Sequence, residues 1–83
     1  MSDPKFKHIG TPPQKLIEEC AELIHAISKA ERFGYFNWHP ARPHSCNAYE
    51  IENEMHDVLT RINEMQAFMQ EMMKTFIRKE SNP

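Results

Sequence analysis

Apolar residues recur at alternating spacings of four and three along two stretches of the chain, the pattern of helices with one buried side. The first stretch predicts a helix over residues 12–33, with the apolar seam Leu16, Cys20, Leu23, Ile27 and Ala30. The second predicts a helix from about Ala48 to Ile77, with the seam Ile51, Met55, Val58, Ile62, Met65, Met69, Met72 and Phe76. The pattern leaves open whether this second helix is continuous or breaks near Gln66.

Residues with special backbone preferences mark the ends of these helices. Thr11 can cap the first helix, Pro12 is tolerated in a first turn, and Gly34 is a typical C-terminal stop. The prolines in the segment after Gly34 argue against a helix there. The predicted organisation is a flexible N-terminal arm at 1–11, one helical domain at 12–79 with a loop at 34–47, and a tail at 80–83.

The two predicted helices differ in length. At 1.5 Å per residue, a second helix of about 30 residues spans roughly 45 Å, whereas a first helix of about 22 residues spans roughly 33 Å. The first helix cannot cover the whole apolar side of the second, so the methionine-rich C-terminal half needs another chain. We therefore expect an all-α fold, in which a helical hairpin builds an oligomeric four-helix bundle as a homodimer or homotetramer.

Composition narrows the partners of the chain. The 83 residues carry a formal net charge of −2 with dispersed basic residues, so no basic surface is available for nucleic acid. No apolar run approaches the ~20 residues that a membrane span needs. The two cysteines lie in different settings, which argues against a disulfide framework. We expect a cytoplasmic protein that binds neither nucleic acid nor membranes.

One pattern of acidic and apolar residues occurs twice, in residues 16–24 and 51–59. When the two segments are superimposed, Glu19 matches Glu54 and Glu22 matches Asp57. Residues three apart share a helix face, so each segment presents two carboxylates on one side. Antiparallel helices would bring the four carboxylates together across a groove. A hard cation such as Mg²⁺ would find there the oxygen ligands that it prefers.

A solvated surface is the alternative interpretation of these acidic residues. Acidic residues at this spacing are common on exposed helix faces, and one pair alone would carry little information. The duplicated pair, in the same phase against both apolar seams, favours a cation site instead. Like charges this close repel one another, so the cluster makes little sense without a cation.

With these motifs, the chain resembles the MazG-like, all-α nucleoside triphosphate pyrophosphohydrolases, some short members of which are encoded by phages. The EExxE motif of that superfamily is matched by Glu18-Glu19-Cys20-Ala21-Glu22, and its ExxD motif by Glu54-Met55-His56-Asp57. A Lys-x-x-Arg-Phe-Gly segment of the short members is matched by Lys29-Ala30-Glu31-Arg32-Phe33-Gly34. The resemblance covers about residues 14–65. The spacing between the two acidic motifs is longer than is usual in the family.

The resemblance implies Mg²⁺-dependent hydrolysis of a nucleoside or deoxynucleoside triphosphate to a monophosphate and pyrophosphate, with Mn²⁺ as an alternative metal. The implied metal ligands are Glu19, Glu22, Glu54 and Asp57. Glu18 is the candidate to orient or deprotonate the attacking water. The candidate substrate-binding residues are Lys29 and Arg32 for the phosphates, and Asn37 and Trp38 for the base. Surface solvation of Arg32 and packing of the loop aromatics onto the bundle are the alternatives.

Two other interpretations of the chain stay open. Phosphoribosyl-ATP pyrophosphohydrolase is a rival substrate assignment within the same superfamily. A non-catalytic helical oligomerisation or regulatory protein could keep the acidic cluster as a cation site. The sequence specifies neither the base, nor the sugar, nor the number of metal ions. A phage-encoded protein of this kind would work in the host cytoplasm.

Overall fold

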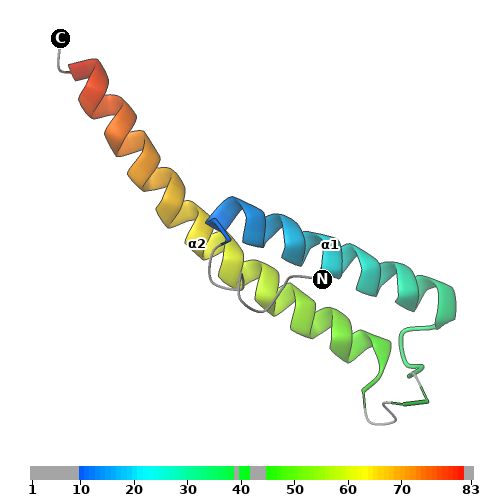
Figure 1. Cartoon of the computed structure of the whole chain (residues 1–83). Helices are drawn as coiled ribbons and strands as arrows, with labels where there is room; N and C mark the ends of the chain where they lie inside the picture. The colour runs from blue at the N-terminus through cyan, green and yellow to red at the C-terminus, as the bar shows by residue number, and fades with distance from the viewer. Residues whose placement is uncertain (1–9, 39, 42–44, 82–83) are drawn as a thin grey trace.

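The computed structural model describes residues 10–38, 40–41 and 45–81, and it is all-helical. Two helices, α1 (Pro12–Phe33) and α2 (Asn47–Ser81), lie side by side and antiparallel, joined by one loop (Figure 1). The expected all-α hairpin is therefore confirmed. The predicted N-terminal arm lies outside the described residues except for Gly10 and Thr11.

Helix α1 begins and ends where its sequence predicts. Thr11 forms a capping box with Gln14: the Thr11 hydroxyl accepts from the Gln14 amide at 3.3 Å, and the Gln14 side chain accepts from the Thr11 amide at 3.1 Å. Pro12 and Pro13 occupy the first two helical positions, where no amide proton is needed. Gly34 ends the helix with a φ of 101°, which favours glycine, and its amide donates to Ala30.

The loop is fastened to the start of α2 by polar contacts. The Asn47 side chain is buried and donates to the Gly34 carbonyl at 2.8 Å, while its amide donates to the Asn37 carbonyl at 2.9 Å. The next amide, of Ala48, donates to the Tyr35 carbonyl at 2.7 Å. Trp38 and Cys46 form an isolated antiparallel bridge. These contacts hold the two helix ends together and so fix the register of the hairpin.

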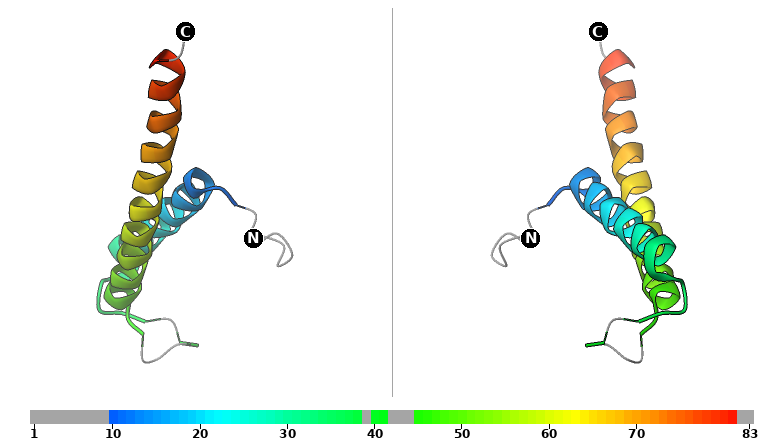
Figure 2. Two further views of the ribbon diagram at one scale, coloured as in Figure 1. Left: turned by 90° about the vertical axis from the view of Figure 1, so that its left-hand side faces the viewer. Right: turned by 90° about the vertical axis from the view of Figure 1, so that its right-hand side faces the viewer.

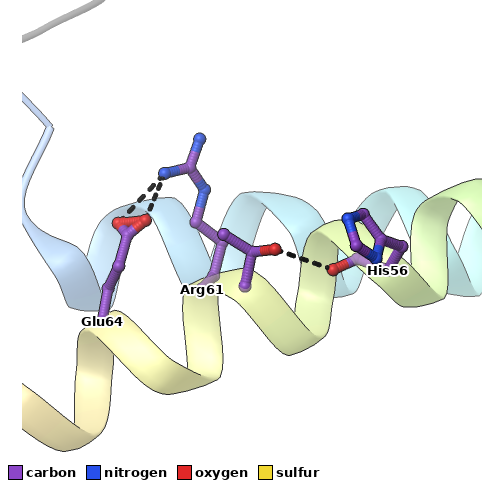
Figure 3. Close-up of polar contacts among 4 residues, drawn as sticks. His56, Arg61 and Glu64 are labelled. Carbon is purple, nitrogen blue, oxygen red and sulfur yellow. Dashed lines mark hydrogen bonds and ion pairs between the residues drawn. The ribbon is translucent and has the colours of Figure 1, made fainter.

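Helix α2 is continuous and longer than expected, since it runs to Ser81, two residues into the segment assigned to the tail. No glycine or proline interrupts it, and Arg78 and Lys79 place positive charge at its C-terminal end, where the helix dipole favours cations. Side-chain contacts within α2 add local support. The Arg61 guanidinium donates to both carboxylate oxygens of Glu64, at 2.8 and 3.1 Å (Figure 3).

The line of contact between the helices runs to one side of the predicted seams. Among the described residues, the buried hydrophobic side chains are Ala26, Ala30 and Val58. Two residues of the predicted seams, Ile27 and Met55, are 39% and 43% exposed. Ala30 and Val58 belong to the predicted seams and are buried, so the prediction holds in part. The contact line is shifted from the centre of each seam towards its acidic flank, which leaves Ile27 and Met55 at the exposed edge. Small alanines on α1 allow the two backbones to approach closely along this line.

This shift gives the hairpin two different faces. Because the helices are antiparallel, positions offset to the same side of the contact line lie on the same face. We define the acidic face by Glu19, Glu22, Glu54 and Asp57. We define the apolar face by six exposed side chains on the other side of the contact line: Ile17, Ile24, Ile27, Met55, Leu59 and Ile62.

Beyond the start of α1, α2 continues alone (Figures 1 and 2). We call residues 69–80, all of which are exposed, the C-terminal overhang. It carries five large apolar side chains: Met69, Met72, Met73, Phe76 and Ile77. The radius of gyration is 17.8 Å, against about 12 Å for a compact domain of this length. No helix within the described residues is long and apolar enough to cross a membrane.

Candidate carboxylate site

Three carboxylates meet between the helices on the acidic face. Glu19 and Glu22 come from successive turns of α1, and Glu54 comes from α2. One oxygen from each can be chosen so that all three lie within 4.8 Å of one another. The fixed loop contacts place these turns at the same level, although Glu22 and Glu54 lie at different distances from the loop along the chain. The spacing of three within each acidic motif is the local cause of the convergence.

The electrostatic environment of Glu19 disfavours its charged form. Burial raises the pKa of Glu19 above its ordinary value of 4.5. The charges of Glu22, Asp57 and Glu54 raise this pKa further, as does a hydrogen bond with Glu22. No basic residue is among the causes, so repulsion and desolvation act in the same direction.

Glu54 on α2 is in a matching position. Burial raises the pKa of Glu54, and the charge of Glu22, a hydrogen bond with Glu22, and the charges of Asp57 and Glu50 add to the effect. One oxygen of Glu54 and one of Glu19 are buried and accept no hydrogen bond among the described residues. A buried carboxylate oxygen without a partner is costly, and a proton or a cation would relieve that cost.

An open cleft of about 560 Å³ leads to these carboxylates. Its lining combines acidic, basic and small side chains from both helices: Ala21, Glu22, His25, Ala26, Lys29, Ser45, Glu50, Asn53 and Glu54. Lys29 contacts Glu50 across the hairpin, with 3.1 Å between the Nζ and Oε2 atoms. The two side chains are only 24% and 18% exposed. This pair places a cation beside the carboxylate cluster.

The other two predicted acidic residues lie outside the cluster. Asp57 is exposed and is close enough to raise the pKa of both Glu19 and Glu54, but it is not one of the three residues whose oxygens converge. Glu18 is exposed and does not line the cleft. The structure therefore brings together three of the four predicted metal ligands, and the predicted catalytic glutamate is not among the residues that line the cleft.

A second cavity of about 320 Å³ adjoins the loop. It is lined by aromatic, amide and basic side chains: Lys29, Phe33, Asn37, Trp38, Pro40 and Asn47. Trp38 is 53% exposed, so its ring is accessible. The Asn37 side chain donates to the Phe33 carbonyl at 2.6 Å, which commits part of its amide to holding the loop. Lys29 lines both cavities and stands at their junction.

Arg32 is the predicted substrate residue that lies apart from both cavities. It is exposed, and its guanidinium carbon lies 5.8 Å from the centre of the Phe33 ring. A cation over an aromatic ring is a weak contact at an exposed site. Arg32 therefore has a local contact with its neighbour Phe33, and its role at the phosphates stays a prediction.

Sequence reasoning missed two residues of this region. Glu50 lies four residues before Glu54, a spacing that places both on one face of a helix, and this signal could have found it. The Lys29–Glu50 contact depends on the register of the hairpin, which no local pattern reveals. Asn47 is the second residue: its side chain is buried and donates across to the Gly34 carbonyl.

The donor set of the cluster fits a hard divalent cation. All three groups are carboxylates, and oxygen ligands are those that Mg²⁺ prefers. The unpartnered buried oxygens of Glu19 and Glu54 are free to accept such an ion. Lys29, which lines the same cleft, pairs with Glu50.

No family model, curated protein or solved structure was found to match the chain.

Proposed function

We propose that the chain is a Mg²⁺-dependent nucleoside triphosphate pyrophosphohydrolase that adds water across the α–β phosphoanhydride, giving a nucleoside monophosphate and pyrophosphate. The observation that carries this proposal is the convergence of Glu19, Glu22 and Glu54 with two buried, unpartnered carboxylate oxygens. The resemblance of the two acidic motifs to the MazG-like superfamily supplies the reaction. An acidic cleft would repel a triphosphate in the absence of a cation. The proposed triphosphate substrate therefore requires the proposed metal site.

The acidic residues of the chain would have different roles in this reaction. Glu19, Glu22 and Glu54 would hold the metal, and Asp57 would complete the ligand set by a change of rotamer from its exposed position. Bound Mg²⁺ neutralises phosphoryl charge and lowers the pKa of a coordinated water. The role of Glu18 in orienting or deprotonating the attacking water has the least support, because Glu18 does not line the cleft.

The two adjoining cavities suggest how a nucleotide would lie. The larger cleft is lined by Glu22 and Glu54 of the carboxylate cluster, and the smaller cavity by Trp38 and Asn37. A phosphate chain in the first and a base in the second would place Lys29 between them, where its ammonium group would contact a phosphate oxygen. A planar base would stack on the exposed indole, as bases do on aromatic side chains.

A phosphoribosyl-ATP substrate is the rival within the same reaction class. A second function, a non-catalytic helical oligomerisation protein, is favoured by a different observation: within the described part of the chain, sixteen large hydrophobic residues are exposed, whereas three hydrophobic residues are buried. The proposed enzyme also needs partners of its own kind, since so small a core does not stabilise a single chain. We therefore propose a homo-oligomer, a dimer or tetramer, acting in the cytoplasm.

Pyrophosphate release tests the proposed reaction. The purified chain is incubated with each common NTP and dNTP and with Mg²⁺, and pyrophosphate and monophosphate are measured. The proposal predicts release that requires Mg²⁺ and falls at least 100-fold in Glu54→Gln, which keeps the side-chain volume but removes a metal ligand. Glu64→Gln is the matched control, because Glu64 is a helical glutamate paired with Arg61 outside the cluster. Release by Glu54→Gln at the wild-type rate would contradict the proposal.

A further inference from the structure

Lys29 and Glu50 form an ion pair that bridges the two helices at the wall of the carboxylate cleft. The Lys29 Nζ and Glu50 Oε2 atoms are 3.1 Å apart, and the side chains are 24% and 18% exposed. Both residues line the cleft, and Lys29 also lines the smaller cavity beside the loop. The ammonium group therefore belongs to a side chain shared by the two cavities that the proposed nucleotide would occupy.

The position of Glu50 is fixed by the contacts of the loop. Glu50 lies in the first turn of α2. Hydrogen bonds tie this turn to the residues that follow α1: the Asn47 side chain donates to the Gly34 carbonyl at 2.8 Å, and the Ala48 amide donates to the Tyr35 carbonyl at 2.7 Å. The positive end of the helix dipole also favours a carboxylate in a first turn. The Glu50 side chain is therefore anchored independently of any ligand.

Glu50 is distinct from the three carboxylates of the candidate cation site. Within the described part of the chain, the groups whose oxygens converge are Glu19, Glu22 and Glu54. Glu50 lies one turn before Glu54 on the same helix face, and its charge is close enough to raise the pKa of Glu54. Its Oε2 atom, however, contacts Lys29. This contact links Glu50 to the proposed substrate without metal ligation.

An ammonium group held in this way is still able to bind phosphate. It carries three N–H donors, and the contact with Glu50 uses one of them. A free lysine side chain loses rotamer freedom when it binds a ligand, and fixing the side chain beforehand reduces that cost. The ion pair therefore prepares Lys29 for a phosphate oxygen.

We propose that Glu50 is a positioning residue, which holds the Lys29 ammonium group between the two cavities for contact with the phosphate chain of the substrate. The proposal rests on the proposed triphosphate substrate and goes beyond it, since neither acidic motif includes Glu50. The opposite case is a Glu50 that competes with phosphate for Lys29 and so weakens binding. The two cases predict opposite changes when Glu50 is withdrawn from the lysine.

The test is a double-mutant cycle on the dissociation constant of Mg²⁺–tripolyphosphate, a phosphate chain without a base, measured by calorimetry. Glu50→Asp keeps the charge and withdraws the carboxylate by one methylene, so it changes position alone. We expect Glu50→Asp and Lys29→Gln each to weaken binding at least fivefold, and the double variant to bind within twofold of Lys29→Gln. Glu52→Asp, at an exposed position of the same helix, is the matched control and should bind as the wild type does.

Steady-state kinetics on the nucleotide that the wild type cleaves fastest give a second readout. Glu50→Asp should raise KM at least fivefold and leave kcat within twofold, because the lysine contact is weakened and the metal ligands are kept. A merely structural role would move kcat instead, since a loss of folded protein lowers the amount of active enzyme.

Three results would overturn the proposal: Glu50→Asp that binds tripolyphosphate within twofold of the wild type or more tightly, a loss that persists unchanged in the Lys29→Gln background, or a wild type that binds no Mg²⁺–tripolyphosphate. Pyrophosphate release separates this failure from that of the proposed function. A wild type that cleaves nucleotides while the cycle shows no coupling overturns the positioning role alone. Coupled binding without cleavage supports the positioning role and contradicts the proposed reaction.

Discussion

The two faces of the hairpin are built from the same two helices, yet their side chains are left unsatisfied in different ways. On the acidic face, burial and mutual repulsion raise the pKa of Glu19 and Glu54, and one oxygen of each has no partner among the described residues. On the apolar face, side chains such as Ile24 and Leu59 are 66% and 59% exposed. The acidic face would be stabilised by a small cation, and the apolar face by contact with a large apolar surface.

The contrast shows how a helix with a wide apolar arc uses one part of it to contact the other helix of the hairpin and leaves another part exposed. Small residues at positions 26 and 30 draw α2 towards the acidic edge of α1, which half-buries the carboxylates there. The same shift leaves the larger isoleucines exposed. One packing choice therefore creates both the candidate cation site and the candidate interface.

A substitution on the contact line between the two helices should have the largest effect on the free energy of unfolding. Ala30 is 1% exposed, so Ala30→Leu has no space for its larger side chain, and we expect a loss of about 1–3 kcal/mol in the free energy of unfolding. Urea denaturation measures this loss. Ala67→Leu is the control, an exposed helical alanine that should change stability by a few tenths of a kcal/mol. Equal effects of the two substitutions would show that α1 and α2 do not pack as described.

On the apolar face, Ile24→Ala should weaken self-association. Loss of a large aliphatic contact is worth about 1–2 kcal/mol, which corresponds to roughly a tenfold rise in the dissociation constant. Sedimentation equilibrium measures it, with Phe36→Ala as the control because Phe36 lies on the loop and is 81% exposed. A dissociation constant that moves with Phe36 and not with Ile24 would place the interface on the loop.

A smaller effect of pH should come from the acidic face. The folded-state pKa of Glu19 and Glu54 is raised above 4.5, so folding favours their protonated forms. In EDTA, their contribution to stability is therefore fully present below about pH 4.5 and is lost as pH rises through the raised values. The difference in urea midpoint between the wild type and Glu19→Gln/Glu54→Gln isolates this contribution. A wild type that gains stability over the double variant as pH rises would contradict it.

The smallest effect is expected from the ion pairs. Glu50→Gln breaks the contact between Lys29 and Glu50, whose side chains are 24% and 18% exposed. We expect it to lower the free energy of unfolding by at most about 1 kcal/mol. Glu71→Gln, which breaks a pair with Lys74 that is mostly exposed, should have no measurable effect. Chemical denaturation of both variants makes the comparison. A larger loss of stability in Glu71→Gln than in Glu50→Gln would contradict the greater burial of the Lys29–Glu50 pair.

Local sequence signals predicted the helices well. The Thr11–Gln14 capping box and Gly34 fix the ends of α1, and the absence of glycine and proline explains why α2 continues through Gln66 to Ser81. The phase of packing could be predicted only in part: Ala30 and Val58 of the predicted seams are buried, whereas Ile27 and Met55 are exposed. An apolar arc wide enough to include both Ala26 and Ile24 does not say which part faces the other helix of the same chain and which faces a partner.

The candidate site was predicted in part for the same reason. Spacing alone brings Glu19, Glu22 and Glu54 to one side of their helices, and the structure places their oxygens together. Asp57 and Glu18 match the motifs equally well, yet they lie outside the cluster, because their placement depends on the rotation of each helix. The contact of Lys29 with Glu50 joins residues 21 positions apart, which only the hairpin register can bring together.

The most direct test of the central claim, that the carboxylate cluster is a cation site, is thermal unfolding of the wild type and Glu54→Gln with and without Mg²⁺. Without Mg²⁺, Glu54→Gln should unfold at the wild-type midpoint or above it, because it removes a charge repelled by Glu22. Mg²⁺ at 100 times its dissociation constant should stabilise the wild type by about 2.7 kcal/mol and the variant far less. A wild-type midpoint that millimolar Mg²⁺ leaves unchanged, or that rises equally in both proteins, would contradict the claim.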